Sequence, residues 1–257
     1  MKESIFKAYD IRGTYPNEIN EQGAYIIGKS YGTYLQKFYD KNKCVIGRDN
    51  RLSSPALYEA LKNGLIDSGI NVICYGEITT PMHYYTRYVE NTFGVMVTAS
   101  HNPKEDNGFK FSFDKYANAR GDMIEDFKDF TFKGDFYKGK GIVVNKDIKN
   151  DYLSYLKDNI NMGKKKIKAV FDMGNGVTAT IIKDVIKEFP NIEPIYICDE
   201  SDGSFPNHHP DPAVEENMAM LKEKVLETNA DIGIAFDGDG DRLGIIDEHG
   251  KFIMADK

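Results

Sequence analysis

The sequence predicts an α/β fold of two tandem domains, each a mixed β-sheet covered by helices on both faces, so that every domain has three layers. Three observations lead to this prediction. Short apolar runs alternate with amphipathic stretches along most of the chain, and a Lys-, Gly- and Asp-rich break interrupts the alternation near residues 133–150. The 257 residues are also enough for about two domains of ordinary size. We expect a first domain over residues 1–146 and a second over residues 147–257.

The first domain shows a β-α-β-α-β order. Its expected strands are the apolar runs "KCVIGRD" (43–49), "INVICYG" (70–76) and "FGVMVTA" (93–99). The stretch "SSPALYEALKNGLIDSG" predicts a helix, because Ser53 or Ser54 can cap its start and Gly69 follows its end. A second helix is expected for "PMHYYTRYVE". This order is typical of a mostly parallel sheet with covering helices.

The second domain repeats this architecture without a recognisable repeat in sequence. Expected helices run from about residue 176 to 189 and from about 213 to 228. Expected strands are "KIKAVFD" (166–172), "IEPIYIC" (192–198), "DIGIAFD" (231–237) and "RLGIIDE" (242–248).

Composition excludes several classes of function. The net charge of −7, from 33 basic and 40 acidic residues, argues against general binding to nucleic acid or to an anionic membrane. The N-terminal "MKESIFKAYDIRG" lacks the apolar core of a signal peptide, and no stretch approaches the ~18 apolar residues of a membrane span. We therefore expect a cytoplasmic protein. Cys44, Cys74 and Cys198 lie in apolar runs without CxxC spacing, so we expect reduced thiols in the core.

The strongest local signal is "AFDGDGDRLGIID", in which Asp237, Asp239 and Asp241 alternate with glycines directly after an expected strand. Three carboxylates so close together repel one another unless a cation holds them. A small set of oxygen ligands suits Mg²⁺, which keeps positions for water or a phosphate oxygen. A calcium-binding EF-hand is excluded, because its sixth position requires Gly and is Arg242 here, although Glu248 falls at the twelfth.

A second signal, "DMGNGVTA", is compatible with dinucleotide binding. Gly174, Gly176 and Ala179 match G-x-G-x-x-A between a strand and a helix, and Asp199 follows the next strand. The same spacing also occurs in an ordinary tight strand-to-helix turn. A nicotinamide enzyme would leave the segments "TASHNP", "GDGDR" and "AYDIRG" unexplained.

The Ser100–His101 pair does not indicate a hydrolase. Neighbouring side chains on an extended chain point apart, and the sequence has no G-x-S-x-G elbow. A turn-capping serine is the plain structural interpretation of Ser100.

Five segments together resemble one family. They are similar in order and spacing to segments of the α-D-phosphohexomutases, specifically the phosphomannomutase/phosphoglucomutase branch, and the resemblance covers essentially the whole chain. "TASHNP" together with "DGDGDR" is far more specific than either alone. The segments are "FKAYDIRG" (6–13), "TASHNP" (98–103), "NGFK" (107–110), "FPNHHPDP" (205–212) and "DGDGDR" (237–242).

The resemblance implies a role for Ser100 as a phosphoserine that hands its phosphoryl group to a hexose monophosphate. A hexose 1,6-bisphosphate would serve as primer and intermediate, turning over in the site and returning its other phosphate. Asp237, Asp239 and Asp241 match the Mg²⁺ ligands, and a phosphoserine oxygen on Ser100 supplies the ion's remaining contact. Phosphoryl transfer needs this combination of in-line positioning and charge neutralisation.

Further residues match basic and polar positions of the family. Arg12 and Lys110 match catalytic positions, where a cation can offset charge or shuttle the hydroxyl proton. Tyr9 and Arg242 match positions on the side of the substrate. His101 follows the nucleophile and is also counted among the catalytic residues, where it is expected to shape the loop or polarise its neighbours rather than to act as the main base.

The resemblance also implies four domains, of which these residues would be the first two. The sugar-selecting and phosphate-clamping loops of the other two would be missing beyond "FIMADK", so we expect the 257 residues to be inactive alone. The segments that carry the resemblance favour glucose or mannose phosphates over glucosamine phosphate as the substrate. His208 and His209 are expected to build the cleft between domains rather than to bind metal. A non-catalytic sugar-phosphate or metal-binding module and an NAD(P)-dependent oxidoreductase remain as alternatives.

Overall fold

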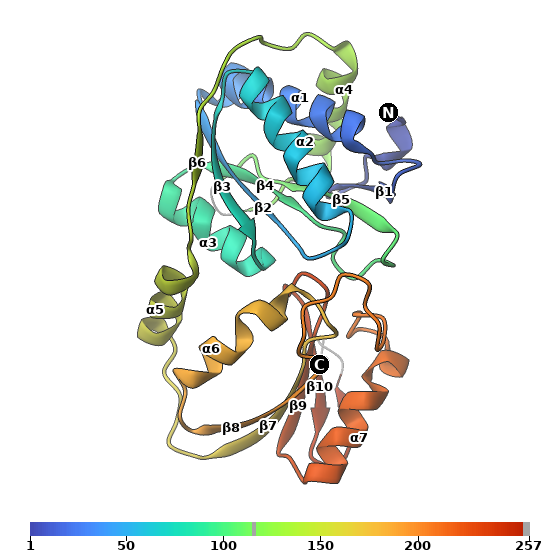
Figure 1. Ribbon diagram of the computed structural model, residues 1–257, viewed down its shortest axis with the longest axis vertical. Coiled ribbons are helices and arrows are strands. Elements are labelled where there is room, and N and C mark those ends of the chain that lie inside the picture. Colours follow the sequence, from blue (N-terminus) through green and yellow to red (C-terminus); the bar gives the residue numbers. More distant parts are fainter. Residues whose placement is uncertain (115–116, 254–257) are drawn as a thin grey trace. The chain divides into compact units, whose positions relative to one another are not determined.

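The computed structural model describes residues 1–114 and 117–253, so the last four residues of "FIMADK" lie outside it. The chain divides into two compact units, each with its own sheet (Figure 1). The prediction of two α/β units with mixed sheets is confirmed. Unit 1 comprises Met1–Ala99 and Lys104–Asp147, and unit 2 comprises Ser100–Pro103 and Ile148–Lys257.

Unit 1 contains a six-stranded sheet with the order β1-β5-β4-β2-β3-β6. The strands β4, β2, β3 and β6 are parallel, whereas β5 pairs antiparallel with both β4 and β1. The elements in chain order are η1 (Glu3–Ile5), β1 (Ile11–Thr14), α1 (Glu21–Tyr39), β2 (Lys43–Arg48), α2 (Ser54–Asp67), β3 (Asn71–Glu77), α3 (Thr80–Glu90), β4 (Phe93–Val97), β5 (Asp106–Phe111), α4 (Asp122–Lys133) and β6 (Val143–Asn145).

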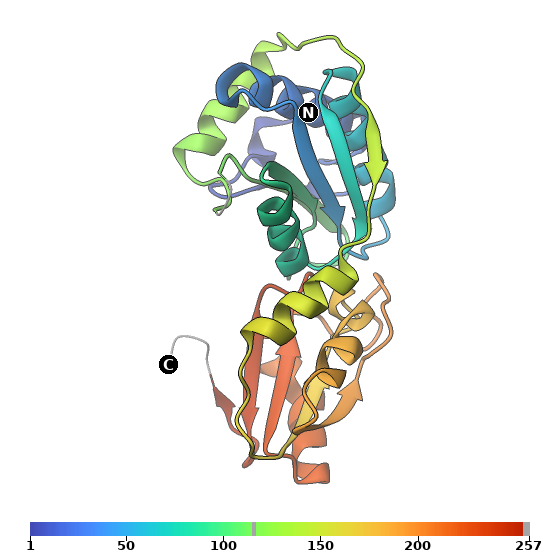
Figure 2. The same ribbon diagram turned by 90° about the vertical axis from the view of Figure 1, so that its left-hand side faces the viewer.

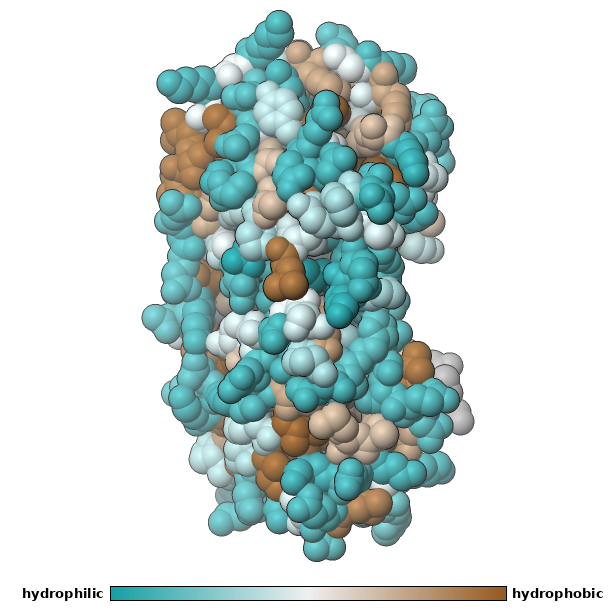
Figure 3. Space-filling model, turned by 45° about the vertical axis from the view of Figure 1, so that its right-hand side comes forward, coloured by the Kyte–Doolittle hydropathy of each residue, from teal (hydrophilic) through white to brown (hydrophobic). Residues whose placement is uncertain are grey.

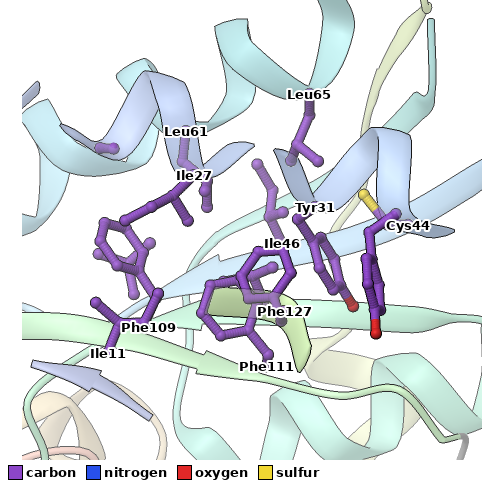
Figure 4. Packing of buried hydrophobic residues seen from close by; sticks show 14 of the residues in the cluster. Ile11, Ile27, Tyr31, Cys44, Ile46, Leu61, Leu65, Phe109, Phe111 and Phe127 are labelled. Atoms are coloured by element: carbon purple, nitrogen blue, oxygen red, sulfur yellow. The ribbon is translucent and has the colours of Figure 1, made fainter. Parts of the chain in front are cut away.

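The main core of unit 1 lies between the sheet and the helices α1, α2 and α4. Figure 4 shows Ile27 of α1 and Leu61 of α2 above Phe109 and Phe111 of β5, with Phe127 of α4 closing the cluster. Because side chains alternate across a strand, the two phenylalanines share one face of β5. Helix α3 covers the opposite face of the sheet (Figures 1 and 2).

A buried ion pair fixes the segment that follows β2. The side chains of Asp49 and Arg51 are 1% and 0% exposed, and Arg51 Nε donates to Asp49 Oδ2 at 3.2 Å. Arg51 also donates to the carbonyl of Asp106 at the start of β5, and Asp49 accepts a hydrogen bond from Thr98, two residues before Ser100. The pair therefore connects both ends of the segment from residue 98 to residue 106.

We expect Arg51→Met to destabilise unit 1 by about 3–5 kcal/mol, because it leaves the buried Asp49 without its cation. Chemical denaturation of the variant and the parent measures this. Lys62→Met is the matched control, since the Lys62–Glu59 pair lies on the surface and such pairs contribute about 0–1 kcal/mol. Equal losses in the two variants would contradict the importance of the buried pair.

Unit 2 contains a five-stranded sheet with the order β11-β10-β9-β7-β8. The strands β9, β7 and β8 are parallel, and β10 and β11 continue the sheet antiparallel. The elements are α5 (Lys149–Asn159), β7 (Ile167–Asp172), η2 (Val177–Thr180), α6 (Ile182–Lys187), β8 (Ile192–Ile197), η3 (Glu215–Met218), α7 (Ala219–Thr228), β9 (Ile232–Phe236), β10 (Leu243–Asp247) and β11 (Phe252–Ile253).

Helices cover both faces of this second sheet. On one face Leu221 and Val225 of α7 pack with Val170 of β7, and on the other Ile182 of α6 packs with Phe171. Figure 1 shows α6 and α7 on opposite sides of the strands. The predicted three-layer arrangement follows from the alternation of Val170 and Phe171 across β7.

Both helices predicted in unit 2 are shorter than expected. In place of a helix over 176–189, a 3₁₀ turn precedes the six-residue α6, because the amide of Val177 donates to the carbonyl of Gly238 and the next residues are largely β-branched. In place of a helix over 213–228, the first turn is 3₁₀ and α7 begins at Ala219.

The predicted thiols fall into two groups. Cys44 and Cys74 are buried in unit 1, as expected. The expectation for Cys198 is wrong, because its side chain is partly exposed and lies at the end of β8 instead of in the core. In this position the thiol meets polar neighbours, which are described below.

The surface is predominantly hydrophilic on the face drawn in Figure 3, where hydrophobic residues appear in small, separate groups. Among the described residues, no helix combines the length and apolar character needed to cross a membrane.

Candidate functional site

The three aspartates predicted to bind metal lie together on the turn between β9 and β10. The carboxylate oxygens of Asp237, Asp239 and Asp241 lie within 4.8 Å of one another. Asp237 organises the turn, since its Oδ1 accepts hydrogen bonds from the backbone amides of Asp241 and Arg242, both at 3.0 Å. The turn therefore holds three carboxylates around one point.

The environment of these carboxylates favours a bound cation. Asp237 and Asp239 are fully buried, whereas Asp241 is exposed. Burial and the neighbouring charges of Asp239 and Asp241 raise the pKa of Asp237 well above its usual range. A divalent cation would relieve both causes, because it offsets the charge of the buried carboxylate and the repulsion among the three.

Ser100 lies beside this cluster within unit 2. Its Oγ donates to Asp237 Oδ2 at 2.7 Å, and the residue is fully buried. Its backbone has φ +54°, in the left-handed region that residues other than Gly, Asn and Asp seldom adopt. Strained positions of this kind gather at functional sites, where the surrounding structure maintains them.

His101 and Arg242 also meet in unit 2, although 141 positions separate them. Arg242 Nη1 donates to His101 Nδ1 at 2.7 Å, and the same Nδ1 lies 3.4 Å from Ser100 Oγ. Because Nδ1 accepts from the guanidinium, it is not available to remove the Ser100 proton in this arrangement. These contacts are compatible with a role of His101 in shaping the loop, which stays a prediction.

The remaining predicted residues, Tyr9, Arg12 and Lys110, belong to unit 1. Arg12 of β1 lies opposite Gly108 of β5, and Lys110 follows two positions later, so both cations lie on the face of the sheet opposite Phe109. Arg12 pairs with Asp10 at 2.6 Å. Tyr9 is 70% exposed on the segment before β1.

The Gly-rich turn after β7 does not favour a dinucleotide. A Cβ on Gly176 would lie 2.8 Å from the carbonyl oxygen of Gly238, so the turn packs tightly against the turn that bears the three aspartates. It leads into a four-residue 3₁₀ helix, not into a helix long enough to bind a pyrophosphate at its N-terminus. Asp199, expected at a ribose, forms an ion pair with Lys183 at 2.5 Å.

Sequence reasoning missed a second polar cluster in unit 2. Asp172 ends β7, Cys198 follows β8, and His208 lies in the segment 205–212, and their ligand atoms approach within 4.8 Å of one another. Asp172 had been assigned only to a strand and Cys198 only to the core. The signal available in the sequence was that two parallel neighbouring strands each end in a side chain able to bind metal.

Comparisons with known proteins agree with this architecture. The family model described as phosphoglucomutase/phosphomannomutase, alpha/beta/alpha domain I, matches residues 3–138, and that for domain II matches residues 150–250. A phosphomannomutase/phosphoglucomutase from Pseudomonas aeruginosa is 41% identical over 262 residues, covering 100% of this chain and 55% of its own length. A phosphoglucomutase from Neisseria meningitidis is 39% identical, covering 100% of this chain and 56% of its own.

Solved structures give the same result. A phosphoglucomutase/phosphomannomutase family protein from Burkholderia thailandensis superposes with a TM-score of 0.92 at 35% identity, covering 98% of this chain and 56% of its own. The chain thus spans about half the length of the relatives it matches. Because the two family models together match residues 3–138 and 150–250, the chain belongs to the phosphoglucomutase/phosphomannomutase family.

Proposed function

We propose that this chain is the phosphoserine- and metal-bearing part of a phosphohexomutase that moves a phosphoryl group reversibly between positions 1 and 6 of glucose or mannose. The observation that carries the proposal is the 2.7 Å contact between Ser100 Oγ and Asp237 within a cluster of three carboxylates. The names of the relatives, which include both phosphomannomutase and phosphoglucomutase, support glucose and mannose phosphates as substrates.

The residues present fit Mg²⁺. Asp237, Asp239 and Asp241 offer oxygen ligands only, which Mg²⁺ prefers, and a cation would offset the charge of the two that are buried. An oxygen of the phosphorylated Ser100 would complete the protein's ligands. When bound, the ion would neutralise negative charge on the phosphoryl group.

In the proposed reaction Ser100 is a carrier. The bond between its Oγ and phosphorus breaks as a sugar hydroxyl oxygen bonds to phosphorus. The proton of that hydroxyl passes to a base of the protein, and the departing Oγ takes up a proton, so that the Ser100 hydroxyl is regenerated. The resulting hexose bisphosphate then turns over, and its other phosphate returns to Ser100 by the reverse step. The buried left-handed turn supports this role, because it fixes the Oγ in one position before the substrate arrives.

Basic side chains would stabilise charge around the phosphoryl group. We assign Arg12 and Lys110 to this task, with Lys110 as the candidate proton shuttle, and Arg242 with Tyr9 to contacts with the substrate. Arg242 also orients His101 through the 2.7 Å hydrogen bond, which supports a role of His101 in holding the loop.

We further propose that residues outside this 257-residue sequence complete the substrate site. The relatives are nearly twice as long as the part that the chain matches. Selection of the sugar and binding of its distal phosphate are assigned to that additional length.

The test is transfer of a phosphoryl group to Ser100. The protein, extended to the length of its relatives, is incubated with glucose 1,6-bisphosphate and Mg²⁺, and its tryptic peptides are weighed. The expected result is one added phosphoryl group on the peptide that contains Ser100, and none after chelation of the metal. Modification of another peptide, or of none, would overturn the assignment, and binding of the sugar without modification would favour a non-catalytic module.

Gly238 offers a second test, because the three-aspartate turn contacts the segment that bears Ser100 at this position. A Cβ there would lie 2.6 Å from the carbonyl oxygen of Ser100, closer than real contacts allow. We expect Gly238→Ala to displace Ser100 and to lower turnover by about 10²-fold, as a misplacement of about 1 Å can. Gly163→Ala is the matched control, since nothing lies within 4 Å of its Cβ. Normal turnover in both variants would contradict the proposed contact.

A further inference from the structure

Asp172, Cys198 and His208 combine three different metal-binding side chains at one end of the unit 2 sheet. Asp172 is fully buried and His208 is 14% exposed, while Cys198 is partly exposed, so the cluster is held by the fold and open to solvent on one side. His208 Nε2 lies 3.1 and 3.0 Å from the two carboxylate oxygens of Asp172, and it also contacts the Cys198 thiol.

The surroundings orient these groups as metal ligands are usually oriented. His208 Nδ1 lies 3.0 Å from the carbonyl oxygen of His209, which can only accept, so Nδ1 carries a proton and Nε2 is the atom that faces the cluster. The carboxylate of Asp172 is fixed in turn, because its Oδ1 accepts from the amide of Gly174 at 2.9 Å. Outer hydrogen bonds of this kind set the tautomer and direction of ligating side chains.

The distances also suit a tetrahedral ion. Ligand atoms around tetrahedral Zn²⁺ lie about 3.4–3.6 Å apart, given metal–ligand bonds of about 2.0–2.3 Å. The nitrogen–oxygen separations here are 3.0–3.1 Å and all the ligand atoms lie within 4.8 Å, so shifts of a few tenths of an ångström would suffice.

We propose that Asp172, Cys198 and His208 form a Zn²⁺ site that is distinct from the three-aspartate turn. Zn²⁺ binds thiolate, imidazole and carboxylate together, with the fourth position left to water, whereas Mg²⁺ avoids thiolate. The ion replaces the proton on His208 Nε2 and the proton of the Cys198 thiol, both of which pass to solvent.

A Zn²⁺ ion here would fix the segment 205–212 next to the three-aspartate turn. His208 belongs to this segment. Pro210 of the same segment lies 3.0 Å from the Cβ position of Gly174 and 3.6 Å from that of Gly238. The ion would thus connect the ends of β7 and β8 with a segment that packs on the turn bearing Asp237. The expected consequence is a higher unfolding temperature of the chain with Zn²⁺.

The test is titration of the 257-residue chain with Co²⁺, a spectroscopic substitute for Zn²⁺, in the presence of excess Mg²⁺. Only a thiolate ligand gives a sulfur-to-cobalt charge-transfer band, so the three-aspartate turn is silent in this measurement. The expected result is such a band at one equivalent, which Zn²⁺ abolishes by displacement. Absence of the band in the parent chain would overturn the proposal.

Variants identify the ligands. Cys198→Ser should remove the band, and His208→Gln should weaken Co²⁺ binding by more than about 100-fold, since loss of even an outer partner costs 10–100-fold. His209→Ala is the matched control, because it keeps the backbone carbonyl that contacts His208, and it should behave like the parent. Persistence of the band in Cys198→Ser would assign it to Cys44 or Cys74 and would also overturn the proposal.

Discussion

Replacing Ser100 by Ala should lower phosphohexomutase turnover by about 10⁴- to 10⁶-fold, the range observed when a covalent nucleophile is removed. The reason is chemical, since no oxygen remains on the turn to carry the phosphoryl group between the two halves of the reaction. The measurement is a coupled assay, with glucose 1,6-bisphosphate as primer, on the protein extended to the length of its relatives.

Ser112 provides the matched control. It is also a buried serine, and its Oγ accepts from the amide of Gly94 at 2.9 Å within the sheet of unit 1. Ser112→Ala should lose some stability but keep turnover within about tenfold of the parent, because an ordinary buried hydrogen bond contributes only about 1 kcal/mol. Substantial turnover in Ser100→Ala would exclude the carrier role, and equal losses in both variants would indicate a structural effect.

The sequence predicted the parts of the site whose signals are local. Asp237, Asp239 and Asp241 lie within five positions behind a recognisable strand, so their convergence follows from a single turn. Ser100 stood out because a polar segment ends an apolar strand, but its proposed role as a phosphoserine came only from the resemblance to the phosphohexomutases. The prediction of mixed sheets is also confirmed, although the antiparallel place of β5 between β1 and β4 depends on pairings between distant segments.

Contacts across long stretches of sequence were not predictable in this way. The hydrogen bond between His101 and Arg242, and the meeting of Asp172 with His208, join segments that only the folded sheet brings together. No spacing rule encodes such pairs.

Helix α1 was missed although its signal was present. Ala24, Ile27, Tyr31 and Leu35 are buried at helical spacing, and Asn20 caps the first turn by accepting from the amide of Gly23. Three glycines within the helix weaken its propensity and obscure the pattern.

Removing one carboxylate from the three-aspartate turn should raise the stability of the protein without Mg²⁺ and lower it with Mg²⁺. In metal-free protein, Asp239→Ala should stabilise unit 2 by on the order of 1 kcal/mol, because it removes a buried carboxylate that repels Asp237. With Mg²⁺ at about a hundred times its dissociation constant, the parent should gain about 2.7 kcal/mol and the variant almost nothing. Thermal unfolding with and without Mg²⁺ measures both effects.

Glu248→Ala is the control for this prediction, and it also checks the exclusion of an EF-hand. Glu248 is exposed and lies just beyond β10, so Glu248→Ala removes the same charge at a distance from the three aspartates. The stability of Glu248→Ala without metal, and the increase in stability that Mg²⁺ gives it, should equal those of the parent. An EF-hand would instead lose its twelfth ligand. Because the proposed ion would supply several kcal/mol to phosphoryl transfer, Asp239→Ala should also lower turnover by about 10³-fold or more, and Glu248→Ala should not. An equal Mg²⁺ gain in Asp239→Ala and the parent would remove the metal from the three-aspartate turn, and with it the proposed charge neutralisation beside Ser100.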